Sequence, residues 1–179
     1  MNTVYSIKNT NNKFFIAWLA GFIDGEGCFT IDLRKEPTSR LGWTCYPMIT
    51  IVLQRSDKFV LEEIQRIMNG TLRNRNNQKS WKIGAKPQTL WRICGWENCL
   101  NLAKTIQPYL ILKSKRCQIF IDTIKMVLSK QGESKRISWN KDLLIETCKM
   151  RDKINKDRST FRHPNYLSVD ILKAKLDLV

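Results

Sequence analysis

Two carboxylates separated by one glycine, Asp24 and Glu26, follow directly on an apolar run over residues 18–23. The run is typical of a helix, and the alternation that begins at Cys28 is typical of a strand. The C-terminal end of a helix carries partial negative charge and favours basic side chains. Acidic residues at this end therefore need compensation, and a bound cation is its simplest source.

The segment around this pair reads Leu19-Ala20-Gly21-Phe22-Ile23-Asp24-Gly25-Glu26-Gly27. It resembles the signature of the LAGLIDADG homing endonuclease family, with phenylalanine for the second leucine, glycine for an alanine and glutamate for the second aspartate. The resemblance implies a site-specific endonuclease that hydrolyses double-stranded DNA with Mg²⁺ or another divalent cation such as Mn²⁺. Divalent cations suit this chemistry because they activate water and stabilise both the attacking and the leaving oxygen.

The resemblance assigns metal binding to the second acidic residue, Glu26, together with the carbonyl of Gly25. Mg²⁺ takes a few carboxylate or carbonyl oxygens and keeps several waters, so DNA phosphates would complete this shell. Asp24 is assigned to helix capping or to a dimer interface, with metal binding as the lesser alternative.

Two further segments resemble the family, residues 51–59 and residues 108–115. In the first, Gln54 would orient a water and Lys58 would offset developing negative charge. In the second, the basic residue of the family segment falls on Lys113. The resemblance makes all three catalytic, whereas the alternative for each lysine taken alone is a solvated surface charge.

The charge balance indicates a polyanionic partner. Lys and Arg number 31 against 16 Asp and Glu, which gives a net charge of +15 and a pI near 9.8. This is the footprint of a nucleic-acid binder, although a ribosomal or membrane-surface protein has similar charge. The single histidine, His163, argues against a Cys₂His₂ zinc site and a histidine general base. No stretch is apolar for long enough to cross a membrane.

Apolar periodicity and turn residues predict an α+β fold in the order helix, two strands, helix, two strands and then helices. We expect helices over residues 13–24, from Ser56 to Gly70, and over 96–106, 114–129, 140–155 and 168–178. We expect strands over residues 28–35, 43–53 and 71–75 and within 80–94. The resemblance implies an αββαββα core whose antiparallel, saddle-shaped sheet has helices on one face. Residues 1–12 would form a polar arm and 13–179 a single domain.

Polar and basic side chains recur at strand spacing in these segments. The residues expected on the open sheet face are Thr30, Asp32, Arg34, Arg73, Arg75 and Arg92. A curved basic β surface can enter a major groove, where arginine reads guanine; the alternative is a solvated sheet face. Arg40 and Lys82 are also assigned to DNA binding, and Arg158 and Arg162 to phosphate contacts.

Small residues at every fourth position of the first helix, Ala17, Gly21 and Gly25, share one face. Such a face lets two backbones approach closely, although the helix could instead pack on its own sheet. Family members with one signature act as homodimers, so the resemblance implies a twofold interface here. Such a dimer would cut a long palindromic or nearly palindromic target across the minor groove, leaving 3′ overhangs.

Two other functions remain open. One is an RNA-binding maturase that assists intron splicing without cutting DNA, and the other is a DNA-binding regulator that has lost catalysis. The Gly25-Glu26 pair with Gln54, Lys58 and Lys113 favours the enzyme, because splicing needs none of them. The composition and the resemblance favour an intracellular, organellar location.

Overall fold

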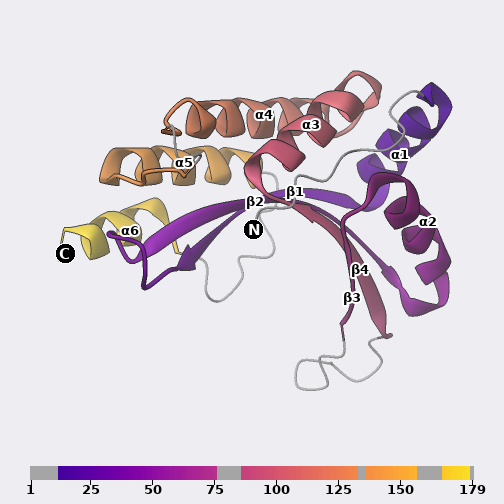
Figure 1. Cartoon of the computed structure of the whole chain (residues 1–179), viewed down its shortest axis with the longest axis horizontal. Coiled ribbons are helices and arrows are strands. Elements are labelled where there is room, and N and C mark those ends of the chain that lie inside the picture. The colour runs from indigo at the N-terminus through magenta and orange to yellow at the C-terminus, as the bar shows by residue number, and fades with distance from the viewer. Residues whose placement is uncertain (1–11, 76–85, 133–135, 157–166, 178–179) are drawn as a thin grey trace. The chain divides into compact units, whose positions relative to one another are not determined.

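The computed structural model describes residues 12–75, 86–132, 136–156 and 167–177 (Figure 1). Its helices are α1 (Lys13–Glu26), α2 (Lys58–Met68), α3 (Trp96–Ile106), α4 (Ser114–Leu128), α5 (Lys141–Ile154) and α6 (Val169–Leu176). Its strands are β1 (Gly27–Lys35), β2 (Trp43–Gln54), β3 (Thr71–Arg75) and β4 (Gln88–Cys94), with 3₁₀ turns η1 (Arg55–Asp57) and η2 (Gln107–Tyr109). The predicted α+β class and the αββαββα order are confirmed.

The four strands form one antiparallel sheet in the order β1-β2-β4-β3. Strand β4 lies between β2 and β3, with Ile51 opposite Trp91 on one side and Leu72 opposite Trp91 on the other. Residues 76–85 of the connection from β3 to β4 lie outside the described residues, as does most of the polar arm predicted over residues 1–12.

The chain divides into two compact units, and each is described by itself. Unit 1 comprises residues 1–28 and 48–114, and unit 2 comprises residues 29–47 and 115–179. In unit 1, α2 packs on β3 and β4, α3 packs on β4, and α1 contacts α3 and η2. In unit 2, α5 packs on α6.

Unit 1 buries one face of its strands. Ile49 and Ile51 of β2 lie opposite Ile93 and Trp91 of β4, and each of the four is at most 2% exposed. Burial of side chains of this size stabilises the fold by about 1.5–3 kcal/mol each. The indole N–H of Trp91 donates to the carbonyl of Asn69 at 2.8 Å, so its one polar group is satisfied.

Unit 2 has its own buried contacts. Phe29 of β1 meets Phe120 of α4 at a ring separation of 5.4 Å, and the thiols of Cys45 and Cys148 hydrogen-bond to each other. That hydrogen bond and burial raise the pKa of the Cys45 thiol well above its usual range. Arg151, 4% exposed, donates to the carbonyl of Leu167 at 2.8 Å and so ties α5 to the segment before α6.

The boundaries of α1 and α2 differ from the predicted ones. Helix α1 runs two residues beyond the predicted end at Asp24 and therefore includes Glu26. Asp57 is the N-cap residue of α2, close to the predicted start at Ser56 and Asp57, but its side chain makes no capping hydrogen bond and Arg55–Asp57 form the 3₁₀ turn η1. The predicted C-terminal end of that helix is confirmed at Asn69, which has a φ of 59°.

No helix among the described residues has the length and apolar character needed to span a membrane.

The turn after α2 provides a test of this packing. We expect Gly70→Ala to destabilise the protein more than Gly42→Ala, in chemical denaturation with urea. Both glycines have positive φ (+93° and +67°), and an added Cβ there costs about 1–3 kcal/mol in strain. Only at Gly70 would the Cβ also lie 2.7 Å from the Trp91 indole nitrogen and 2.8 Å from the Arg92 carbonyl. Equal losses for the two variants would contradict the close packing of this turn.

Candidate active site and nucleic-acid surface

Asp24 lies in the last turn of α1 and is only 8% exposed. Its carboxylate accepts hydrogen bonds from three successive backbone N–H groups: Oδ2 from Ile111 at 2.6 Å and Leu112 at 3.1 Å, and Oδ1 from Lys113 at 2.8 Å. Three successive N–H groups form a concavity that binds anions. Asp24 therefore caps, but it caps the segment before α4 rather than its own helix. Its carboxylate is buried, whereas the small residues Ala17, Gly21 and Gly25 of α1 are exposed.

Lys113 returns a cation to the end of α1. Its ammonium donates to the carbonyls of Ile23 at 2.8 Å, Asp24 at 2.6 Å and Gly25 at 3.2 Å. The last carbonyls of a helix lack partners within the helix and carry its partial negative charge. The compensation that the sequence attributed to a bound cation is thus supplied by a lysine from elsewhere in the chain.

Glu26 is the last residue of α1 and is exposed. Its carboxylate makes no hydrogen bond or ion pair with any residue in the described ranges, in contrast to that of Asp24. The carbonyl of the preceding Gly25 accepts one hydrogen bond and retains a second lone pair. One free carboxylate and one carbonyl are donors of the kind that Mg²⁺ prefers.

This donor set is small. The described part of the chain holds no group of three or more His, Cys, Asp or Glu residues arranged to bind a metal. A Mg²⁺ ion at Glu26 and Gly25 would therefore need oxygens from water, from a phosphate or from another chain.

Gln54 and Lys58 belong to unit 1 with Glu26. Gln54 is the last residue of β2; it is exposed and lies opposite Gln88 of β4. Lys58 is the first residue of α2, and its ammonium pairs with the Glu62 carboxylate at 3.0 Å. Antiparallel neighbours β1 and β2 place Gln54 and Glu26 toward the same end of their hairpin. Within the described residues, no hydrogen bond joins Gln54 or Lys58 to Glu26. Among the three predicted catalytic side chains Gln54, Lys58 and Lys113, Lys113 is the one that hydrogen-bonds to the end of α1.

Unit 1 presents a polar and basic sheet face. Residues directly opposite one another in an antiparallel pair share a face, as do alternate residues of one strand. The three rows of this face are Gln54-Gln88-Arg75, Val52-Leu90-Arg73 and Thr50-Arg92-Thr71. Arg73 and Arg75 are exposed, and the Nε of half-buried Arg92 has no hydrogen-bond partner among the described residues. Sequence reasoning missed Thr50, Thr71 and Gln88, because only the register shows that they accompany the arginines.

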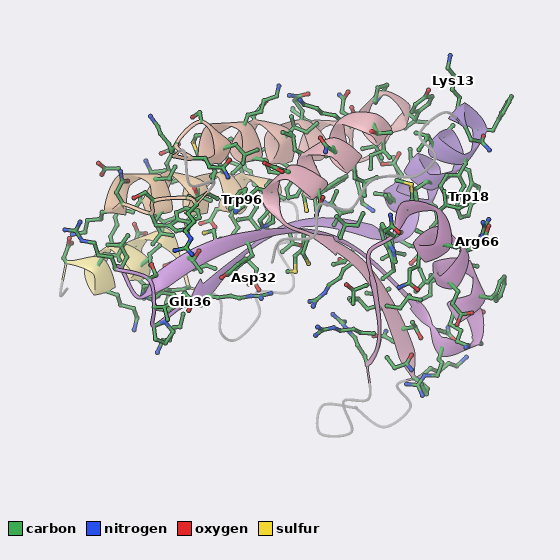
Figure 2. All side chains as sticks on the ribbon, viewed as in Figure 1. Lys13, Trp18, Asp32, Glu36, Arg66 and Trp96 are labelled. Atoms are coloured by element: carbon green, nitrogen blue, oxygen red, sulfur yellow. The ribbon has the colours of Figure 1, made fainter. Side chains whose placement is uncertain are left out.

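Unit 2 carries the three remaining predicted strand residues. Thr30, Asp32 and Arg34 alternate along β1 with the buried Phe29 and Ile31. Arg34 pairs with Asp32 at 2.7 Å, and both side chains are about half exposed, so the pair is of the kind that contributes little stability. Figure 2 shows Asp32 and Glu36 on this part of the chain.

Tyr46 of β2 extends this group in unit 2. The Arg34 guanidinium lies 5.1 Å from the Tyr46 ring centre, and the phenol donates to Glu36 at 3.3 Å. Burial and the nearby Glu36 carboxylate raise the pKa of Tyr46, so it remains a neutral donor. Arg40 is exposed in the turn between β1 and β2.

The remaining basic residues assigned to DNA, Lys82, Arg158 and Arg162, lie outside the described residues.

Helix α1 exposes its small residues. The buried side of the helix consists of Ile16, Leu19, Ala20 and Ile23. The exposed side carries the predicted interface residues Ala17, Gly21 and Gly25. A Cβ added at Gly21 or Gly25 would meet no atom within 4 Å, so these glycines do not serve packing against the chain's own sheet.

Large apolar side chains accompany this exposed face of α1. Phe14 is 91% exposed and Trp18, labelled in Figure 2, is 45% exposed and stacks on Phe22 with ring centres 5.3 Å apart. Ile111 and Leu112, in the segment held by Asp24, are 85% and 79% exposed. Exposed apolar groups of this kind mark interaction sites in soluble proteins.

Comparisons with known proteins agree with this architecture. The chain is 24% identical over 147 residues to the DNA endonuclease I-CvuI of Chlorella vulgaris, a match that covers 82% of this chain and 81% of that protein. The crystal structure of I-CvuI with a DNA target superposes with a TM-score of 0.74 at 22% identity, covering 95% of this chain and 97% of that one. The archaeal intron-encoded homing endonuclease I-Vdi141I, complexed with DNA, gives 0.69 at 17% identity, covering 94% and 98%. A model of the LAGLIDADG endonuclease family matches residues 19–127, and the chain therefore belongs to that family.

Proposed function

We propose that this protein is a site-specific DNA endonuclease that cuts both strands of a palindromic or nearly palindromic target as a homodimer. The observation that carries the proposal is the exposed carboxylate of Glu26, which has no hydrogen-bond or ion-pair partner in the described part of the chain. It lies at the end of a helix whose other acidic residue, Asp24, accepts three backbone N–H groups. A carboxylate without a partner beside a compensated helix end is a ready ligand for a cation. A protein that only binds nucleic acid has no need of it.

Glu26 and the Gly25 carbonyl would hold a divalent cation, Mg²⁺ or Mn²⁺, with phosphate oxygens of DNA. When bound, the cation supplies an activated water and neutralises charge on the phosphate. Lys113, fixed next to Gly25, adds positive charge where the phosphate becomes more negative, and Lys58 does so from the start of α2. Gln54 orients the water. The related I-CvuI was crystallised with DNA in the presence of Mg or Ca, which supports a divalent cation here.

Two copies are needed because each chain brings one such carboxylate and a duplex has two strands. The exposed Ala17, Gly21 and Gly25 allow two α1 helices to approach closely, and the twofold axis would then place one Glu26 at each strand. Twofold symmetry of the protein implies the palindromic target. Cleavage across the minor groove with 3′ overhangs, and an organellar location, remain part of this proposal through the family resemblance.

DNA contacts come from the sheet faces of both units. Base edges in the major groove would be read by two groups of side chains. These are Arg73, Arg75 and Arg92 in unit 1, and Thr30, Asp32 and Arg34 in unit 2. Arg40 and Lys82 would add further DNA contacts. Phosphate contacts would come from Arg158 and Arg162 and would position the protein without reading sequence.

The first test is Glu26→Gln, which we expect to abolish Mg²⁺-dependent cleavage while leaving DNA affinity largely unchanged, because the amide is a poor cation ligand of similar shape. Cleavage is measured on a randomised palindromic library, and affinity on a duplex recovered from it. The control is Glu97→Gln, an exposed glutamate in the first turn of α3. Retained cleavage by Glu26→Gln would remove this residue from the site, and no cleavage by the wild type would favour the RNA-binding alternative.

The dimer is tested with Gly21→Leu. The new side chain points into open space in one copy and would therefore block a second helix from approaching. Sedimentation equilibrium should show a weaker dimer, while Gly132→Leu, also at a position with nothing within 4 Å, should associate as the wild type does. A Gly21→Leu protein that stays dimeric at low concentration would place the interface elsewhere.

Base reading is tested with Arg75→Ala. If Arg75 makes a bidentate base contact, its loss should cost about 1–3 kcal/mol and relax preference at one symmetric pair of positions. The measurement is the affinity for single-base variants of the target. Arg66→Ala is the control, because Arg66 is an exposed arginine of α2 that pairs with Glu63. A uniform loss across all sequences, with a salt slope smaller by about one, would make Arg75 a phosphate contact instead.

A further inference from the structure

We infer that Asp24 is a positioning residue for catalysis: its carboxylate fixes residues 111–113 and thereby holds the Lys113 ammonium beside Glu26. The inference rests on the proposed nuclease function and assigns Asp24 a role that it performs through Lys113.

Asp24 holds Lys113 from both ends. Its Oδ1 accepts the backbone N–H of Lys113 at 2.8 Å, and its own carbonyl accepts the ammonium of the same lysine at 2.6 Å. An ammonium has three N–H donors, and the carbonyls of Ile23, Asp24 and Gly25 account for all three. A long, flexible side chain is thus restricted to one position at the carbonyl of Gly25, the residue before Glu26.

Little else holds the segment. Ile111 and Leu112 are 85% and 79% exposed, so their side chains contribute almost no burial between the buried Leu110 and Lys113. The backbone N–H groups of these two residues both donate to Asp24 Oδ2, at 2.6 and 3.1 Å. The carboxylate is therefore the main anchor of residues 111 and 112.

A conservative change breaks this anchor. Asparagine has the shape of aspartate but replaces one acceptor oxygen with an N–H₂ group, and both oxygens of Asp24 accept from backbone N–H groups. Asp24→Asn therefore leaves at least one of the three N–H groups facing a donor. The helix itself keeps its length, its buried side and its N-terminal cap at Asn12.

The first experiment measures the anchor without DNA or metal, by amide hydrogen exchange in the full-length protein. In Asp24→Asn the amides of residues 111–113 should exchange about tenfold faster or more, because they lose their acceptor. Asn12→Ala is the matched control: it removes the cap at the other end of α1, which accepts from Phe15 at 3.0 Å, and should leave residues 111–113 protected. Unchanged exchange of these amides in Asp24→Asn would overturn the inference.

The second experiment is a double-mutant cycle on the rate of cleavage, with a duplex that the wild type selects from the palindromic library. Asp24→Asn should lower kcat about tenfold or more at nearly constant KM, since a displaced group costs rate rather than binding. Lys113→Met should lower kcat as well. If Asp24 acts through Lys113, the double variant should be no slower than Lys113→Met alone.

Multiplied effects in the double variant would assign Asp24 a general structural role and overturn the inference. Asn12→Ala combined with Lys113→Met provides the comparison, because its effect should be independent of the lysine. Absence of cleavage by the wild type would instead refute the proposed function, while the exchange experiment would still decide whether Asp24 anchors the segment.

Discussion

The reciprocal contact between the end of α1 and residues 111–113 is the interaction on which the site depends. Asp24 offers a carboxylate to three backbone N–H groups, and Lys113 returns an ammonium to three backbone carbonyls. Each charge meets the partial charge of opposite sign that unpaired backbone groups present. Because these partners satisfy one another, α1 can end in a second acidic residue, Glu26, whose carboxylate is exposed and meets no partner among the residues that the structure describes.

The remaining features divide between the two sides of α1 and of the unit 1 sheet. Helix α1 buries its large aliphatic side chains within unit 1 and exposes Ala17, Gly21 and Gly25. The strands bury Ile51 and Trp91 on one face and place Arg, Gln and Thr side chains on the other, around a central row that also contains Val52 and Leu90. Both surfaces that the proposed function uses, one for a second copy and one for DNA, thus lie opposite buried side chains that hold them in place.

Local order along the chain was largely predictable. Helix and strand positions follow from apolar periods of about 3.6 and 2, and most boundaries agree within two residues. Local signals were less informative about side-chain contacts: Asp57 is the N-cap residue of α2, yet its side chain makes no capping hydrogen bond and Arg55–Asp57 form η1. Helix α1 continues past Asp24 because its end is stabilised by Lys113, which is distant in the sequence.

The sequence by itself determined the type and order of the helices and strands and the excess of basic over acidic residues. It also determined the candidate catalytic residues Glu26, Gln54, Lys58 and Lys113. All of these depend on residue types and short spacings. The sequence also brought out the conflict between an acidic pair and a helix end. Only the tertiary structure decided how that conflict is resolved, which of the two acids is buried and which is exposed, and which side chains share a row with Arg92. These outcomes depend on contacts between residues far apart in the chain and on strand register, and local propensity does not encode either.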